Sequence, residues 1–163
     1  MDEKDYTLLQ LLEENCRTPV SDLAVMAELS EQDARDRIGR LEEAGAIRRY
    51  AAVVDWERVG NGNVAAVIEL KVSPERDFGY DRIAERIARF PQVRSLRLMT
   101  GAYDLQLLVV GPSMNEIARF VSEQIAPMDR IRETATHIIM KTYKENGTVF
   151  AERGEVERLP YSF

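Results

Sequence analysis

The sequence of 163 residues, 45% of them hydrophobic, is long enough for one domain or two small ones with a packed core. Its formal net charge is -6, and the whole excess lies in residues 1–60, which hold 14 Asp and Glu against 8 Lys and Arg. No stretch approaches the roughly 18 uninterrupted apolar residues of a membrane span, and the acidic start MDEKDY is unlike a signal peptide, so we predict a cytoplasmic globular protein without membrane contact.

The first 45 residues predict three short helices. Leucines recur at helical spacing in DYTLLQLLEEN (5–15), and a second helical pattern follows in VSDLAVMAEL (20–29), where Ser21 is the expected N-cap. The third helix is expected to begin at the capping residue Ser30, to end at Gly45 and to bury Ala34, Ile38 and Leu41.

A strand is predicted after these helices. The segment AIRRYAAVVD (46–55) is rich in β-branched and aromatic residues, and the polar, Gly-rich connector DWERVGNGN (55–63) follows it. Helix, helix-turn-helix and strand in this order are typical of a winged helix-turn-helix. We therefore predict a winged helix-turn-helix DNA-binding domain with its linker over residues 1–60.

The exposed face of the third helix is acidic for a helix that would enter a DNA groove. Carboxylates repel phosphates, although a deeply placed one can accept a hydrogen bond from cytosine. An equally simple explanation is a solvated helix stabilised by ion pairs four residues apart, each worth a few tenths of a kcal/mol. The pairs expected here are Glu31–Arg35, Asp33–Arg37 and Asp36–Arg40.

Both explanations concern the same polar residues of this helix and of the segment after it. If the helix reads double-stranded DNA, the contacts are expected from side chains on its exposed face and from the arginines that follow. These candidate DNA-binding residues are Gln32, Arg35, Asp36, Arg37, Arg40, Arg48 and Arg49.

Residues 61–145 predict a second domain in which strands and helices alternate as βαββαβ. Apolar residues alternate in the strands and recur at helical spacing in the helices. This order places two helices on one face of a four-stranded antiparallel sheet and leaves the other, half-apolar face open, which favours a homodimer. The expected strands cover 64–72, 93–100, 103–111 and 132–143, and the helices 80–90 and 113–125.

Residues 146–163 are predicted as a C-terminal extension. Asn146-Gly147 indicates a type I′ hairpin with an added strand, and about the last ten residues are expected to be disordered. The lone Cys16 and lone His137 argue against a disulfide and a metal site, so we expect no metal, no cofactor and no catalytic residue. Four methionines are expected to fill the core: Met99, Met114, Met128 and Met140.

Three stretches of the sequence form a recognisable set: DYTLLQLLEEN, LSEQDARDRIGRLEEAGAIRRYAAVVD (29–55) and TGAYDLQLLVV (100–110). With them, nearly the whole chain resembles the Lrp/AsnC family of transcriptional regulators, although the family often has Ser, Pro or Arg where this chain has Glu31, Asp33 and Asp36. It implies an α+β fold with an N-terminal winged helix-turn-helix and a C-terminal ferredoxin-like effector domain. It also implies double-stranded DNA and an amino acid bound between subunits as partners, and a sheet-to-sheet homodimer that assembles to an octamer.

The turn TGAYD is the candidate effector site. In the simpler view, Gly101 supplies a positive φ and Asp104 bonds a nearby backbone N–H. In the functional view, the turn amides hold a carboxylate while Asp104 pairs with an α-ammonium. The candidate effector-binding residues are Thr100, Gly101, Ala102, Tyr103 and Asp104, with Thr134 and Thr136 on one face of the last strand for side-chain recognition.

Two alternative functions remain open at this point. Siroheme decarboxylases are built on a similar scaffold, although the single His137 leaves no cluster of His, Arg and Tyr for a tetrapyrrole. An amino-acid sensor that has lost DNA binding would also explain the acidic helix.

Overall fold

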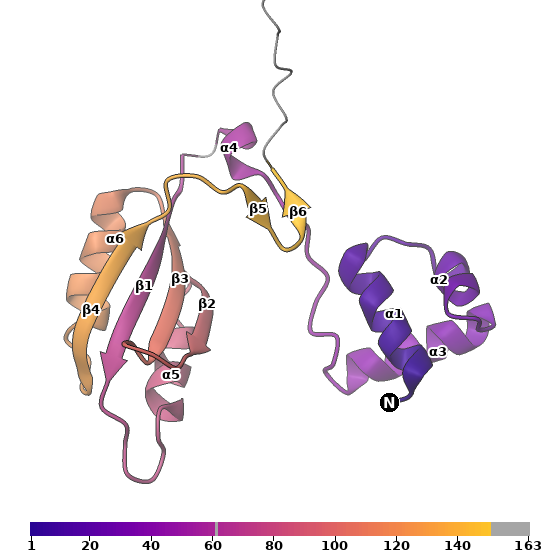
Figure 1. Ribbon diagram of the computed structural model, residues 1–163, viewed down its shortest axis with the longest axis horizontal. Coiled ribbons are helices and arrows are strands. Elements are labelled where there is room, and N and C mark those ends of the chain that lie inside the picture. The colour runs from indigo at the N-terminus through magenta and orange to yellow at the C-terminus, as the bar shows by residue number, and fades with distance from the viewer. Residues whose placement is uncertain (61, 151–163) are drawn as a thin grey trace, which may run out of the picture. The chain divides into compact units, whose positions relative to one another are not determined.

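The computed structural model describes residues 1–60 and 62–150. They divide into two compact units, an N-terminal one that ends at Val53 and a C-terminal one that begins at Val54. The N-terminal unit consists of three helices (Figure 1). Leucines from α1 and α2 pack around Ala34 and Ile38 of α3, as the helical spacing predicts. The helices are α1 (Glu3–Glu14), α2 (Val20–Met26) and α3 (Glu31–Glu43).

The ends of α2 and α3 test the capping predictions. Ser30 caps α3 by accepting the Asp33 N–H at 3.2 Å, and Gly45 ends the helix with a φ of 69°, both as predicted. The prediction of Ser21 as the cap of α2 is wrong, because the helix begins two residues earlier than predicted, with Pro19 at the cap position. The ring of Pro19 fixes φ at -57°, close to the helical value, so the chain enters the helix without a side-chain cap.

The strand predicted over residues 46–55 is not formed. These residues have no regular secondary structure, and Tyr50, Val53 and Val54 are exposed. A strand is stable only when its backbone pairs with another strand, and among residues 1–53 the structure contains helices alone. Residues 46–55 therefore have the composition of a strand, but this unit offers no strand with which they could pair.

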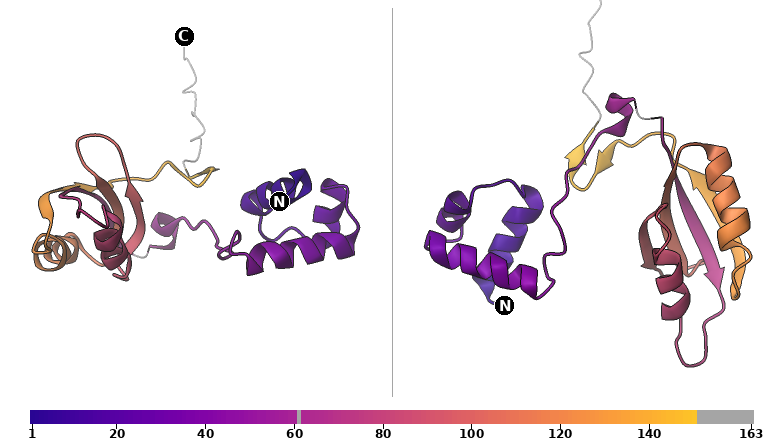
Figure 2. Two further views of the ribbon diagram at one scale, coloured as in Figure 1. Left: turned by 90° about the horizontal axis from the view of Figure 1, so that it is seen from below. Right: turned by 180° about the vertical axis from the view of Figure 1, so that it is seen from behind.

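The C-terminal unit is the predicted four-stranded antiparallel sheet with both helices on one face (Figures 1 and 2). The strand order β2-β3-β1-β4 is that of a ferredoxin-like fold, which confirms the α+β architecture expected from the sequence. The strands are β1 (Val64–Val72), β2 (Val93–Leu98), β3 (Leu105–Gly111) and β4 (Ile131–Ile138), and the helices are α5 (Asp81–Ala88) and α6 (Met114–Phe120), which continues as the π-helix η1 (Val121–Ile125).

The core of this unit lies between the sheet and the two helices. Alternate residues of β1 and β3 face the helices and are buried, whereas their neighbours face the open side and are only half-buried. The helix residues that face the sheet are buried as well: Ile83, Ile87, Ile117, Phe120, Val121 and Ile125. Phe90, just after α5, is partly buried against them. Of the four methionines predicted for the core, Met128 alone is buried, because Met99, Met114 and Met140 lie where strands and helices end or open to solvent.

Three short elements complete the described chain. The connector forms one helical turn, α4 (Trp56–Val59), and a hairpin of β5 (Lys144–Glu145) and β6 (Thr148–Val149) turns through Asn146 and Gly147, both with positive φ, as predicted. The tail expected to be disordered falls on residues 151–163, outside the described residues. No helix in residues 1–60 or 62–150 is long and apolar enough to cross a membrane.

A single arginine joins the start of α1 to α3. Asp2 and Asp5 form a reciprocal capping box, and the Arg37 guanidinium bonds Asp2 at 2.7 Å, Asp5 at 2.9 Å and Asp33 at 3.1 Å. The Arg37 side chain is only 16% exposed, so water screens these bonds less than those of a fully solvated pair. Arg37 lowers the pKa of Asp2, and the Asp2 N–H is the main group that lowers the pKa of Asp5.

Replacing Arg37 by Ala is expected to destabilise the N-terminal unit, with the loss disappearing in acid. Carboxylates with a lowered folded-state pKa stabilise the fold above their unfolded pKa of about 3.9, and that contribution is lost as pH falls through the folded value. Hydrogen exchange of the α1 and α3 amides should therefore be faster in Arg37→Ala at neutral pH. The difference from wild type should shrink below about pH 4.

The control is Arg35→Ala, because Arg35 pairs with Glu31 at 2.6 Å while both side chains are more than half exposed. Equal protection of wild type and Arg37→Ala at neutral pH would show that the arginine does not hold the two helices together.

Candidate functional site

The exposed face of α3 presents the residues that the sequence predicted. Ala34, Ile38 and Leu41 are buried on one side, and the opposite side is solvent-exposed. The exposed candidates on this helix are Gln32, Arg35, Asp36 and Arg40.

The charges on this face are distributed differently from the expected row of ion pairs. Glu31–Arg35 and Asp33–Arg37 form, but Asp36 accepts a hydrogen bond from the Gln32 amide at 2.8 Å instead of pairing with Arg40. The prediction of an Asp36–Arg40 pair is therefore wrong: the partner of this carboxylate is the Gln32 amide, one helical turn toward the N-terminus. Within the described chain Arg40 has no ion-pair partner, which leaves its guanidinium available at the surface.

Three further arginines were candidates for DNA binding, and one of them, Arg37, is already bonded within the N-terminal unit. Arg37 is held by three carboxylates beneath the exposed face, so its main contribution is to packing. Arg48 and Arg49 are exposed in the segment after α3. Tyr50 connects that segment to the helix, since its hydroxyl donates to Glu42 at 2.7 Å. Partial desolvation of the hydroxyl and this bond raise the pKa of Tyr50 to about 12.

The turn from Thr100 to Asp104 is closed by the bonds of Asp104. Its carbonyl accepts the Met99 N–H at 2.8 Å and its N–H donates to the Leu70 carbonyl at 2.9 Å. One carboxylate oxygen accepts the Val72 N–H at 2.7 Å and the other accepts the Tyr80 hydroxyl at 3.0 Å, which raises the pKa of Tyr80. Asp104 thus bonds a backbone N–H, as the simpler view of the sequence expected, and each oxygen retains further acceptor capacity.

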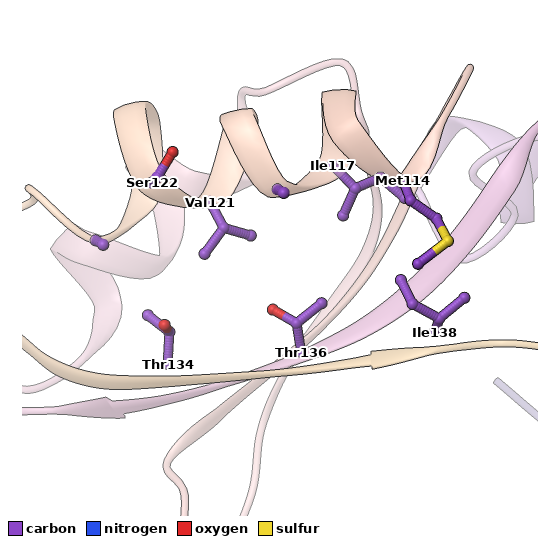
Figure 3. Close-up of a pocket in the computed structure, with 9 residues that line it drawn as sticks. Met114, Ile117, Val121, Ser122, Thr134, Thr136 and Ile138 are labelled. Carbon is purple, nitrogen blue, oxygen red and sulfur yellow. The ribbon is translucent and has the colours of Figure 1, made fainter.

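Thr134 and Thr136 line a groove between α6 and β4 rather than the open face of the sheet. The groove has a volume of about 380 Å³ (Figure 3). Ile117 and Val121 point from the helix toward the two threonines and Ile138 on the strand. The full lining is Met114, Ile117, Ala118, Val121, Ser122, Ala126, Thr134, Thr136 and Ile138.

The two groups of effector candidates do not meet within one chain. The register sets Thr134 opposite Leu70 on the β4 side of β1, whereas Asp104 bonds Leu70 from the β3 side. Neighbouring strands lie about 4.8 Å apart, so the backbones of β3 and β4 are about 10 Å apart across β1. No residue of the turn lines the groove.

Sequence reasoning missed the helical wall of this groove. Met114, Ile117, Ala118, Val121 and Ser122 follow the i, i+3, i+4, i+7, i+8 spacing of one helix face, and residues 134, 136 and 138 alternate along one strand face. Both periods are visible in the sequence. What they do not reveal is that these two faces lie opposite each other, with a groove between them.

Family models match both units. A model described as the AsnC-type helix-turn-helix domain matches residues 1–42, and one described as the Lrp/AsnC ligand binding domain matches residues 65–149. The curated relatives include the HTH-type transcriptional regulator YugG of Bacillus subtilis, which is 40% identical over 161 residues, covering 98% of this chain and 97% of the relative. A Pyrococcus horikoshii HTH-type regulator is 31% identical over 144 residues, covering 88% and 89%.

Solved structures agree with these matches. A Neisseria meningitidis transcriptional regulator in complex with L-Met has a TM-score of 0.69 at 28% identity, covering 89% of this chain and 93% of that one. An AsnC family regulator from Agrobacterium tumefaciens has a TM-score of 0.69 at 31% identity, covering 89% and 94%. These relatives are all named as regulators of transcription, which favours a regulator over the siroheme decarboxylase alternative.

Proposed function

This chain belongs to the Lrp/AsnC family of transcriptional regulators, and we propose that its regulatory effector is an amino acid bound between subunits of a homo-oligomer. The observation that carries the proposal is the separation of the polar turn at Asp104 from the groove at Thr134 and Thr136. Each of them is only part of an effector site, and the two parts do not meet on one chain. The L-Met bound to the Neisseria meningitidis relative supports the chemical class of the effector.

For DNA recognition, we propose that α3 enters the major groove of double-stranded DNA with Arg40 as its principal cation. Arg40 is exposed and unpaired within the described residues, whereas Arg35 shares its charge with Glu31. Asp36 lies one helical turn from Arg40 and Gln32 about two turns away on the same face, and Arg48 and Arg49 are exposed in the segment after the helix. Arg37 is left out of this set because three carboxylates already hold it.

Removing the carboxylate of Asp36 is expected to strengthen non-specific DNA binding, because it withdraws a negative charge from the neighbourhood of phosphates. Asp36→Ala should bind random duplex about three- to tenfold more tightly at about 50 mM salt, and Arg40→Ala should bind more weakly. Band shifts on random DNA and on the protein's own upstream DNA measure both effects.

Glu13→Ala on α1 is the matched control, since it removes an exposed acid from another helix. Unchanged binding by both Asp36→Ala and Arg40→Ala would show that this face of α3 does not meet DNA. If wild type itself fails to shift either DNA, the amino-acid sensor without DNA binding becomes the better description.

For the effector, we propose that the turn of one chain and the groove of a second chain close on one amino acid. A free amino acid presents a carboxylate and an ammonium, which match the turn amides and the remaining acceptor capacity of Asp104. Thr100, Gly101, Ala102 and Tyr103 supply the turn backbone, and Thr134 and Thr136 contribute hydroxyls from the other side.

Asp104→Asn is expected to weaken effector binding while the fold stays intact. The amide oxygen can still accept the Val72 N–H, and the amide NH2 can donate to the Tyr80 hydroxyl in place of the bond that the carboxylate accepted there, but the negative charge that would face the ammonium is lost. A charge-assisted hydrogen bond is about twice as strong as a neutral one, so affinity should fall about tenfold, equivalent to about 1.4 kcal/mol. Calorimetric titration uses whichever of the twenty amino acids raises the melting temperature most.

Asp22→Asn serves as the control, because it makes the same change at an exposed aspartate of the N-terminal unit. Equal affinities of wild type and Asp104→Asn would mean that Asp104 acts only in closing the turn.

For assembly, we propose a homodimer through the open sheet face and an octamer built from such dimers. Val67, Leu108 and Val110 are only half-buried on this face, more apolar surface than a solvated sheet usually carries. A Glu69–His137 contact at 3.3 Å and a Lys71–Glu133 ion pair at 3.7 Å flank them.

Leu108→Arg is expected to dissociate the dimer, since the register places Leu108 directly opposite Val67 and the new charge would be buried without a partner. Analytical ultracentrifugation of the full chain at micromolar concentration measures the change. Ala88→Arg, on the exposed end of α5, should leave the assembly unaltered. A wild-type chain that sediments as a monomer would refute the proposed assembly.

A further inference from the structure

We infer that the groove between α6 and β4 selects an effector with an uncharged aliphatic or thioether side chain, an inference that rests on the proposed function. It names the class of amino acid, which the turn alone does not determine. The turn recognises only the ammonium and carboxylate that all amino acids share, so discrimination has to come from the surface that receives the side chain.

The lining of the groove carries no charge. Six of its nine residues are apolar, and the other three are Ser122, Thr134 and Thr136. The Ser122 hydroxyl is already used, because it donates to the Arg119 carbonyl at 3.2 Å and points away from the strand (Figure 3). The surface offered to a ligand is therefore an apolar helix face opposite a strand with two hydroxyls.

The two threonines have hydrogen-bonding capacity left over. Neither side chain has a hydrogen-bond partner within residues 1–60 and 62–150, although both line the groove. A hydroxyl can donate to a carboxylate and accept from an ammonium. Thr134 and Thr136 can thus meet the polar end of an amino acid, while Ile117, Val121 and Ile138 contact an apolar side chain.

A charged side chain would be disfavoured in this groove. Moving a carboxylate or an ammonium from water to an apolar wall without an opposite charge is costly, and hydroxyls compensate only in part. An aliphatic or thioether group gains instead from leaving water. The volume of about 380 Å³ is at the small end of the range for small-molecule sites, which suits a ligand of amino-acid size.

The test compares effectors on the full-length protein. Leucine, isoleucine, valine and methionine are expected to bind at least about tenfold more tightly than aspartate, glutamate, lysine and arginine in calorimetric titrations. A preference for a charged amino acid would overturn the assignment of the groove while leaving the proposed amino-acid effector standing. Failure of all twenty to bind would overturn the proposed effector and this inference together.

A substitution then locates the binding surface. Ala118→Leu adds bulk to the exposed helical wall and should weaken binding of the preferred amino acid about tenfold. Ala88→Leu makes the same change at an exposed position on α5 and should leave affinity within about twofold. An apolar effector that binds Ala118→Leu as tightly as wild type would show that the groove does not receive its side chain.

Discussion

Strand β1 holds the C-terminal unit together because it is hydrogen-bonded to β3 on one side and to β4 on the other. Its inward residues Ala66, Ile68 and Leu70 are fully buried against the helices, so the strand has little freedom to slip in register. The polar features depend on that register. The Leu70 carbonyl and the Val72 N–H together fix Asp104, and Thr134 lies opposite Leu70 on the other side. A single buried strand thus determines where the turn and the groove lie, and keeps them apart.

Many of the acidic side chains of the N-terminal unit form bonds within that unit. Asp2 and Asp5 cap α1 and, with Asp33, surround Arg37, while Asp36 accepts from Gln32. These carboxylates stabilise the helices at the cost of positive potential toward DNA, since each bound arginine is partly neutralised. An HTH of this kind suits a regulator whose affinity comes from several tethered copies, because tethering raises effective concentration without new contacts.

The sequence predicted best where one physical signal dominates. The alternation in residues 64–72 and the helical spacing in 113–125 correspond closely to β1 and to α6 with η1, because burial of one face decides both. It failed where the outcome depends on a partner. Residues 46–55 have strand composition but no strand to pair with, and Asp36 had two candidate donors, of which Gln32 is bonded. Predicting the groove would have required knowing that α6 packs beside β4. Neither the helical spacing of α6 nor the alternation along β4 shows this by itself.

The separation of turn and groove has a thermodynamic consequence for the proposed regulator. An effector that contacts two chains binds the assembled state more tightly than the separate chains, so it must favour assembly by the same free energy by which assembly favours effector binding. Assembly in turn sets how many DNA-binding heads are tethered together, and hence the overall affinity for DNA. In this arrangement the α3 surface needs no contact with the effector to respond to it. The weak intrinsic affinity expected of an acidic recognition helix is then an advantage, because DNA occupancy follows the state of assembly more steeply when a single head binds poorly.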